Sequence, residues 1–465
     1  MIFCIIMTPV RLPLVIAAVA TVLTAADPGS RPTFSKDVAP IFHKHCVACH
    51  RPKDIAPMSL VDFKSARPWA KSIRESVATR RMPPWFADPR YGHFANDPRL
   101  SEQEIATVTA WVDAGAPEGD PRDLPRVTLA AAEGWQTPAL LGDGRMKGPD
   151  IVIDIGEDFR VSPEGDDAYE HFTVPTNFKE GVWIRAAEIR PGNREVVHHA
   201  HVLLVDDDPA KMEVASTSNM PTLSKYLIKE GKLTRIRQDA PVVNDACDAS
   251  AATTGLPYLT GSQEGALASF LPGRAPDIFP EGTAKWIPPG AKLEFVIHYA
   301  RTSKQNQTDR TSIGLYLAPG GGRTPPATVL RRMDLRNFFM QIPAGAGHHE
   351  VRRCYTFEKD QYLLSFTPHM HYRGKDATYE LIRPGATRRE TLLAVPRYDF
   401  NWQLVYRLEK PLLVEKGSRL IVTIHYGNSA NNRANPDPAK VIRWGDRTEE
   451  EMMTSWIEYL DVSSK

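Results

Sequence analysis

The feature that most constrains the chain is a single Cys-x-x-Cys-His run, Cys46-Val47-Ala48-Cys49-His50. Two thiols at this spacing can each add to a vinyl group of haem, and the imidazole that follows can ligate the iron. The other interpretations are a structural or redox-active dithiol and half of a zinc site, but the sequence has no second Cys-x-x-Cys to complete such a site. We therefore predict a covalent c-type haem held by Cys46, Cys49 and His50.

The N-terminus agrees with haem attachment outside the cytoplasm. An apolar run from Leu12 to Ala26 follows Arg11 and ends in small residues, which predicts a secretory signal peptide over residues 1–26. Pro9, Arg11 and Pro13 interrupt this region and leave the run short for a spanning helix. We expect a periplasmic or secreted protein with no membrane span after signal cleavage.

Length and composition place further limits on the chain. At 465 residues it is expected to form about three domains of roughly 150 residues each. The formal net charge is +1 and the charged residues are mixed in sign, so no nucleic-acid partner is indicated. With Cys4 in the signal peptide and two cysteines taken by haem, Cys247 and Cys354 remain as a disulfide or as two buried thiols.

The haem motif lies in a predicted helical domain over residues 31–120. Residues 38–42 predict a short helix before the motif, and residues 100–114 predict an amphipathic helix after it. Ser101 can cap the second helix, with Glu104 three residues further on. This pattern is typical of a small class I cytochrome c domain.

The sixth ligand of the iron must come from between these helices, and Met82 is the best candidate. It stands in Arg81-Met82-Pro83-Pro84, where consecutive prolines favour an extended loop that could hold a thioether toward the iron. A His/Met pair gives a high reduction potential. Met58 and His93 are rival candidates.

A Pro- and Gly-rich linker is expected over residues 121–149, and short alternating runs begin after it. Examples are residues 151–155, 292–299 and 419–426, separated by Pro, Gly, Asn and Asp clusters. The region is too large for one β-sandwich. We predict two all-β sandwiches, over residues 150–320 and 325–462, joined at the Gly/Pro-rich stretch between them.

Histidines gather at three places in the β region. His369 and His371 are two apart, so on a strand both point to one face and can share a metal ion, although such pairs are also common on surfaces. In the run His198-His199-Ala200-His201, adjacent histidines point to opposite faces of a regular strand. Joint use of His198 and His199 therefore requires a bulge or a strand end, and spacing alone favours His199 with His201.

A lone imidazole, His298, interrupts the apolar strand predicted over residues 295–300, where a histidine is more often a core residue than a ligand. Together these places resemble the ligand motifs of the copper type II ascorbate-dependent monooxygenases, in matching order along the chain. The motifs are Val197-His198-His199, Phe295-Val296-Ile297-His298-Tyr299, Pro368-His369-Met370-His371-Tyr372-Arg373-Gly374 and Glu450-Glu451-Met452. The resemblance covers roughly Asp150 to Asp461.

The resemblance implies two jelly-roll domains, each holding one of two copper ions. His198, His199 and His298 would bind the electron-transfer copper, and His369, His371 and Met452 the copper that meets O2 and substrate. Imidazole suits both oxidation states of copper, and a thioether favours Cu(I). Met453 could replace Met452, and His201 could replace one of the paired histidines.

The predicted function is hydroxylation of a C–H bond of an unknown small or peptide substrate with O2. Our hypothesis is that an external donor reduces the haem, the haem reduces the three-histidine copper, and that copper supplies the second one. One alternative is a non-catalytic haem and copper protein that only passes electrons or binds copper. Another is a β-sandwich hydrolase that uses carboxylates, in which the histidines are incidental.

Overall fold

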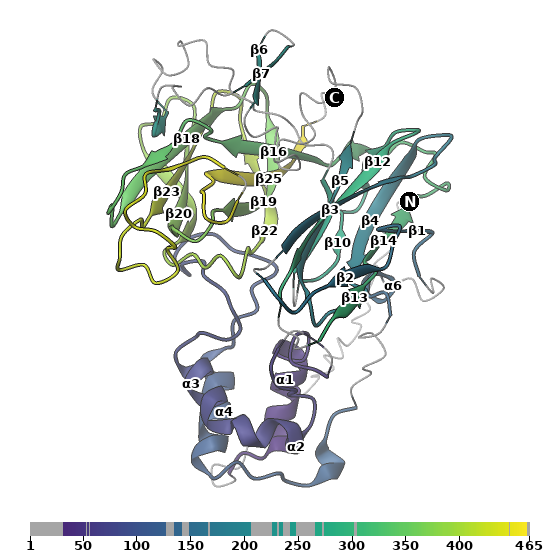
Figure 1. Cartoon of the computed structure of the whole chain (residues 1–465). Helices are drawn as coiled ribbons and strands as arrows, with labels where there is room; N and C mark the ends of the chain where they lie inside the picture. Colours follow the sequence, from purple (N-terminus) through teal and green to yellow (C-terminus); the bar gives the residue numbers. More distant parts are fainter. Residues whose placement is uncertain are drawn as a thin grey trace, which may run out of the picture.

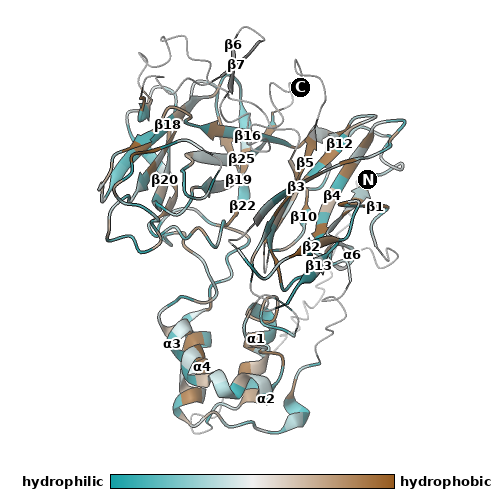
Figure 2. Ribbon diagram, viewed as in Figure 1, coloured by the Kyte–Doolittle hydropathy of each residue, from teal (hydrophilic) through white to brown (hydrophobic). Residues whose placement is uncertain are grey.

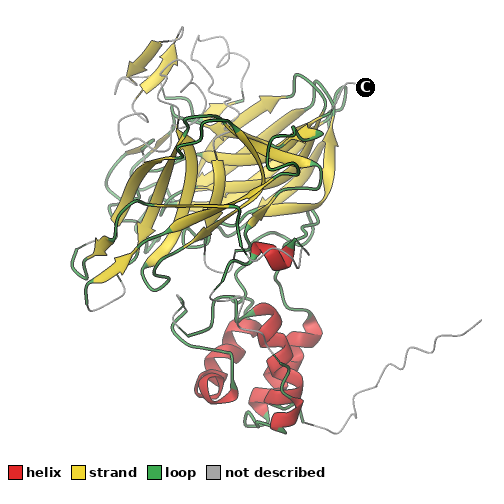
Figure 3. Cartoon of the chain, turned by 90° about the vertical axis from the view of Figure 1, so that its right-hand side faces the viewer, coloured by secondary structure: helices red, strands yellow, loops and turns green. Residues whose placement is uncertain are grey.

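The computed structural model describes residues 31–462, apart from 53, 55, 127–133, 142–147, 166–167, 206–225, 230–231, 236–241, 248–265, 272–273, 302–304 and 446. The predicted signal peptide lies outside the described residues. A small helical part lies beneath two β-rich halves, and the side view shows the strands gathered in one body above the helices (Figures 1 and 3). Within the described ranges, no helix has the length and apolarity needed to cross a membrane.

Two helices of the helical part form where the sequence predicts them, and the helices over residues 63–78 were not predicted. The predicted segment 38–42 falls at the start of α1, and the predicted segment 100–114 contains α4, whose Ser101 N-cap forms a capping box with Glu104. Phe34, Phe42 and Trp111 pack at its centre. The helices are η1 (Phe34–Val38), α1 (Ala39–His45), α2 (Phe63–Ala66), η2 (Arg67–Trp69), α3 (Ala70–Ala78), α4 (Glu102–Asp113), η3 (Pro121–Asp123) and, further on, α6 (Thr137–Leu140).

The first β half is a two-sheet sandwich. One sheet has the order β1-β14-β4-β11-β15 with β10 paired to β4, and the other has the order β3-β12-β5-β9. The strands are β1 (Ile151–Asp154), β14 (Ser312–Leu317), β4 (Val182–Arg190), β11 (Thr283–Ile287), β15 (Thr328–Val329), β10 (Asp277–Ile278), β3 (Ala168–Pro175), β12 (Lys292–Tyr299), β5 (Val197–Val205) and β9 (Ala266–Phe270). A small pair, β2 (Phe159–Val161) with β13 (Gln307–Asp309), completes it. A separate pair, β6 (Tyr226–Lys229) with β7 (Lys232–Arg235), lies at the top of Figure 1, above the second half.

The second β half is also a sandwich, with sheet orders β16-β25-β19-β22 and β21-β20-β23-β18-β8. Hydrophobic and hydrophilic residues interleave along the strands of both halves, as expected for sheets with one face toward a core (Figure 2). The strands are β16 (Arg331–Arg336), β25 (Thr454–Asp461), β19 (Gln361–His369), β22 (Tyr406–Val414), β21 (Arg389–Val395), β20 (Gly374–Ile382), β23 (Arg419–Tyr426), β18 (His349–Thr356), β8 (Asp245–Ala246) and the pair β17 (Gln341–Ile342) with β24 (Ile442–Arg443).

The predicted β-sandwich architecture is confirmed, while the identity of the helical part as a cytochrome c domain stays a prediction. The division of the β region at residues 320–325 also stays a prediction. Strand pairing shows two segments that pair across this predicted boundary. β15 pairs with β11 of the first half, and β8, which precedes β9 in sequence, pairs with β18 of the second half.

An extended segment, residues 82–99, leaves the helical part and packs on the second sandwich. Trp85 is 7% exposed and joins the core of that sandwich, where its ring meets Tyr406 at a centroid distance of 4.8 Å. The backbone N–H of Ala95 donates to the carbonyl of Arg407 at 2.9 Å. The helical part is therefore attached to the second sandwich through hydrophobic packing as well as through the chain.

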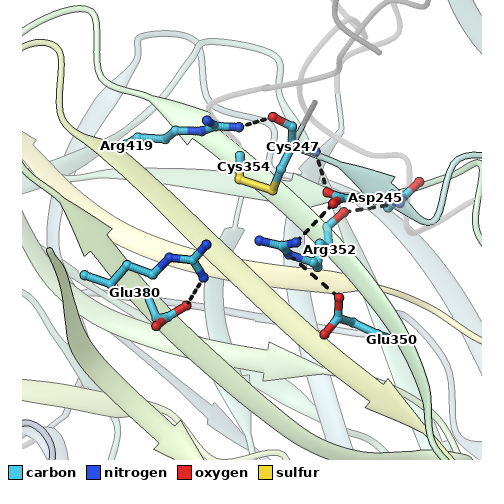
Figure 4. Close-up of a disulfide and its surroundings, with 9 residues drawn as sticks. Asp245, Cys247, Glu350, Arg352, Cys354, Glu380 and Arg419 are labelled. Atoms are coloured by element: carbon cyan, nitrogen blue, oxygen red, sulfur yellow. Dashed lines mark hydrogen bonds and ion pairs between the residues drawn. A yellow bond between two sulfur atoms is a disulfide. The ribbon is translucent and has the colours of Figure 1, made fainter. Parts of the chain in front are cut away.

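A disulfide between Cys247 and Cys354 settles the question that the sequence left open. It joins the end of β8 to β18, and the guanidinium of Arg419 donates to the carbonyl of Cys247 beside it (Figure 4). Arg352 pairs with Asp245 across the same strands at 3.0 Å. The bridge therefore fixes a segment that lies between strands of the first sandwich in sequence onto the five-stranded sheet of the second sandwich.

Reduction of this disulfide is expected to lower the free energy of unfolding by about 2–4 kcal/mol, because it closes a loop of 107 residues in the unfolded chain. Urea denaturation of the oxidised and reduced protein measures the difference. Among the described cysteines only Cys247 and Cys354 are bridged, so the reductant acts on this bond. Equal unfolding midpoints would contradict the expectation.

Candidate metal centres and the cleft between the sandwiches

The four-stranded sheets of the two sandwiches face each other across a cleft of about 440 Å3. On β5, Ala200, Val202 and Leu204 point into the hydrophobic core of the first sandwich. Side chains alternate along a strand, so His199 and His201 point to the other face, into the cleft. The same alternation on β19 and β25 brings further side chains to the opposite wall, among them His369 and Trp456. Both predicted metal-binding segments therefore contribute to one cleft.

His198, His199 and His298 come together on the wall formed by the first sandwich. One ring nitrogen of each lies within 4.8 Å of the others, and His298 Nδ1 is 3.1 Å from both His198 Nδ1 and His199 Nε2. His199 is opposite His298 in the strand register, whereas Tyr299 is opposite Val197, so a bulge falls at His198. This is the irregularity that joint use of adjacent histidines requires.

Burial favours the neutral form of the His199 imidazole. It holds the pKa of His199 well below its usual value, and the neighbouring His298 and His201 lower it further. Tyr169 stacks on His298 with a ring-centroid distance of 4.4 Å and covers that side of the cluster. Among the described residues, no polar atom partners the buried Nδ1 of His199. Three imidazoles without a carboxylate form a donor set that suits copper.

His201 lies on the same wall but is held by a different partner. Its Nδ1 is 2.9 Å from the hydroxyl oxygen of Ser269, on the neighbouring strand β9. Burial, followed by the charges of Arg274 and His369, lowers the pKa of His201 to about 3. The structure therefore brings His198 rather than His201 together with His199 and His298. The assignment of copper ligands stays a prediction.

His369 and His371 lie on the wall formed by the second sandwich, with ring centroids 5.3 Å apart and planes nearly perpendicular. His369 Nδ1 is 2.8 Å from Gln403 Oε1, and His371 Nδ1 is 3.3 Å from the carbonyl of Glu450. Both partners accept, so each Nδ1 carries the proton and each Nε2 keeps its lone pair. Burial lowers the pKa to about 4 for His369 and to about 3 for His371, whose neighbour His369 adds to the shift.

Met452 lines the same cleft, whereas Met453 is fully buried in the core of the second sandwich. This difference favours Met452 over its neighbour as the thioether ligand. The carboxylate of Glu451 accepts backbone N–H groups of His371, Arg373 and Met452 at 2.8, 2.6 and 3.2 Å. Burial raises the pKa of Glu451 to about 7 against the effect of these bonds. Glu451 therefore ties the two segments that hold the candidate ligands.

Trp456 lies on the second wall, and its ring reaches toward the first. Its ring centroid is 5.0 Å from that of His369 and 6.3 Å from that of His201, which in turn is 5.7 Å from His199. Arg332 covers the indole at 5.2 Å. A continuous series of ring contacts therefore links the histidines of the two walls.

Sequence patterns did not single out Trp456 or Gln403, and Glu451 was noted only as a neighbour of Met452. Gln403 comes from the loop before β22 and Trp456 from the middle of β25, far in sequence from the histidines they contact. A histidine-rich run indicates the candidate ligands, but no local signal in the sequence indicates the residues that contact them.

The Cys-x-x-Cys-His motif follows α1, and its residues fit the predicted covalent haem attachment. Cys46 and Cys49 are unpaired thiols, and burial raises their pKa to about 12 and about 11. A reactive redox dithiol needs a lowered pKa instead. His50 Nδ1 donates to the carbonyl of Met58 at 3.3 Å, which leaves Nε2 with its lone pair for iron.

The three candidates for the sixth ligand lie in different surroundings. Met58 packs against the helical core close to the haem-binding motif. Met82 lines a hollow beside Val77 and Ile105 at the edge of that core. The carbonyl of His93 accepts the N–H of Glu409 from β22 on the second sandwich. The identity of the sixth ligand stays a prediction.

Comparison with known proteins identifies a family for the last part of the chain. Residues 329–465 match the family model of the copper type II ascorbate-dependent monooxygenase C-terminal domain. This range contains His369, His371 and Met452 but not the three-histidine cluster. No curated protein matches the chain.

Two solved structures show weak similarity. The major capsid protein P2 of bacteriophage PM2 has 9% identity and a TM-score of 0.19, over 64% of this chain and 99% of that chain. The mavirus major capsid protein has 8% identity and a TM-score of 0.19, over 74% of this chain and 93% of that chain. Nothing about fold or function follows from likeness at such TM-scores.

Proposed function

Because residues 329–465 belong to a domain family of copper type II monooxygenases, which are oxidoreductases, we propose that the chain is an exported monooxygenase that hydroxylates a C–H bond of a small or peptide substrate with O2. The observation that carries the proposal is the meeting of the three-histidine cluster and the His369/His371 pair at one cleft, with Met452 beside the pair. Bound copper supplies one-electron redox and oxygen chemistry.

In this proposal each wall of the cleft holds one copper ion. His198, His199 and His298 would hold the electron-transfer copper behind the surface of the first wall, where Tyr169 shields His298. His369, His371 and Met452 would hold the second copper at the cavity, which the substrate must enter. Phe400 and Trp456 supply apolar surface there, and Arg447 and Glu449 line the same cavity.

The helical part contacts the sandwich that contains the three-histidine cluster, which supports electron delivery from the haem. Buried Asp54, four residues after His50, pairs with Arg51 at 2.7 Å and lies 3.6 Å from the guanidinium of Arg194. Arg194 stands four residues before His198 and also covers the ring of Phe270 at 5.3 Å. An external donor would reduce the haem, and this contact would bring the haem close to β5.

Metal and haem analysis of the mature full-length protein tests the proposal. We expect one covalent haem by pyridine haemochrome, and copper in both clusters by elemental analysis of wild-type and cluster variants. Oxygen consumption coupled to a hydroxylated product separates a monooxygenase from a non-catalytic electron carrier. Haem without cluster-bound copper would contradict the proposal and leave an exported cytochrome fused to a binding module.

Replacement of Gln403 by alanine is expected to weaken copper binding at the second cluster by roughly 10- to 100-fold, because its Oε1 orients His369 through Nδ1. Competition with a copper chelator measures the affinity. Asn401→Ala is the matched control, because Asn401 is exposed in the same loop and bonds Asp399 instead. Equal affinities in the two variants would show that Gln403 does not orient the ligand.

Trp456→Leu is expected to lower kcat without changing copper content, because it interrupts the ring contacts between the walls. Electronic coupling falls steeply across a gap, so loss of the indole slows electron transfer between the clusters. Steady-state kinetics and elemental analysis measure the two quantities. Trp456→Phe keeps a ring and should restore most of the rate; an unchanged kcat in the leucine variant would exclude this path.

A further inference from the structure

A third group of metal-binding side chains lies on the outer face of the second sandwich, away from the cleft. The register of the five-stranded sheet places Glu350 of β18 and Asp376 of β20 opposite His425 of β23. Ile424 and Tyr426 on either side of His425 point into the core, so His425 points outward. Three adjacent strands therefore present a row of a carboxylate, an imidazole and a second carboxylate.

A second imidazole joins this row from the turn before β18. His348 Nε2 lies 3.3 Å from Asp376 Oδ2, and His425 Nδ1 lies 2.6 Å from Asp376 Oδ1. The two imidazoles stack with a centroid distance of 4.0 Å and an angle of 20°. Ligand atoms of His348, Asp376 and His425 all lie within 4.8 Å of one another. Both imidazoles therefore direct a nitrogen at the same carboxylate.

The other nitrogen of His425 faces Glu350, with Nε2 3.4 Å from Glu350 Oε2. When Nε2–H donates to this carboxylate, Nδ1 keeps a lone pair directed at Asp376. Histidines that bind metals usually donate their second nitrogen to a carboxylate in this way. Glu350 also has Arg352 at 3.9 Å, but that guanidinium pairs more closely with Asp245, at 3.0 Å (Figure 4). The two carboxylates therefore leave negative charge for a cation.

We propose that His348, Asp376 and His425 form a third metal site, which takes a late first-row divalent ion of the Zn2+ class. Two imidazoles and one carboxylate suit such an ion, and separations of 2.6 and 3.3 Å between ligand atoms need only a small adjustment around it. The His348 side chain is 54% exposed and that of Asp376 20%, so water completes the coordination. The ion links β20, β23 and the turn before β18.

Zinc binding to the copper-loaded full-length protein tests this site, with copper and zinc counted separately by elemental analysis. Wild-type protein is expected to bind one more equivalent of Zn2+ than either His348→Ala or Asp376→Asn. Glu380→Gln is the matched control, because Glu380 lies outward on the same strand but pairs with Arg389 at 2.9 Å. It should bind as much zinc as wild type.

The same zinc content in wild type, His348→Ala and Asp376→Asn would overturn the proposal and leave a hydrogen-bonded surface cluster. Because His348 is largely exposed, the alanine variant tests the site without changing the core. A rise in unfolding temperature on adding Zn2+, smaller in His348→Ala than in Glu380→Gln, gives a second readout. Absence of copper from the protein would refute the proposed function but not this site, because the two metals are counted separately.

Discussion

The His369→Ala variant is expected to lose one equivalent of copper. Its rate of hydroxylation should fall by more than about 100-fold, because loss of a hydrogen-bond partner of a metal ligand alone lowers metal affinity or activity by up to roughly that factor. His369 is 9% exposed, its Nδ1 is engaged by Gln403, and its Nε2 is left for a metal at the cavity. Elemental analysis and product formation under O2 measure the two effects. The three-histidine cluster on the opposite wall should keep its copper, because no strand of the first sandwich changes.

His201→Ala is the matched control for this experiment. It removes another imidazole from the same cleft, a half-buried one whose Nδ1 meets Ser269 rather than the cluster. Its copper content should equal that of wild type. Loss of copper from His201→Ala with retention in His198→Ala would show that His201 replaces His198. Full hydroxylation by His369→Ala would refute the proposed oxygen-reacting site.

The three-histidine cluster shows what spacing can and cannot predict. Regular alternation of side chains along a strand predicts that His199 and His201 lie on the same face, and β5 does place both in the cleft. The partner of His199 is decided instead by the bulge at His198, which depends on pairing with β12 almost 100 residues later. The resemblance to a known family supplied this pair, because no local pattern in the sequence marks the bulge.

Long-range packing explains the other features that sequence patterns left open. Residues 242–247 pair with the second sandwich through β8 and the disulfide, although they precede the last strands of the first. The segment around Trp85 leaves the helical part and fills the core of the second sandwich. Composition and periodicity indicate only local structure. The pairing of residues 242–247 and the packing of Trp85 both depend on residues far away in the sequence, so neither could be predicted from composition or periodicity. By contrast, the capping box of Ser101 and Glu104 is local and was predicted correctly.

Replacement of Cys46 and Cys49 by serine is expected to abolish covalent haem and turnover supported by the physiological donor. The two thiols are the described residues that can form thioethers, because Cys247 and Cys354 form a disulfide. Copper content should stay at the wild-type value, because the clusters lie in the two sandwiches. Pyridine haemochrome, elemental analysis and donor-driven oxygen consumption measure these quantities.

A small reductant such as ascorbate provides the control, because it can reach copper without the haem. The serine variant should hydroxylate substrate with ascorbate at a rate close to that of wild type, which shows that the cleft is intact. The contact of Asp54 with Arg194 is the reason to expect the haem to act on the first sandwich, because Arg194 stands shortly before β5, which contains His198 and His199. Equal turnover of both proteins with the physiological donor would refute the relay, and loss of turnover with ascorbate would mean that the helical part supports the cleft structurally.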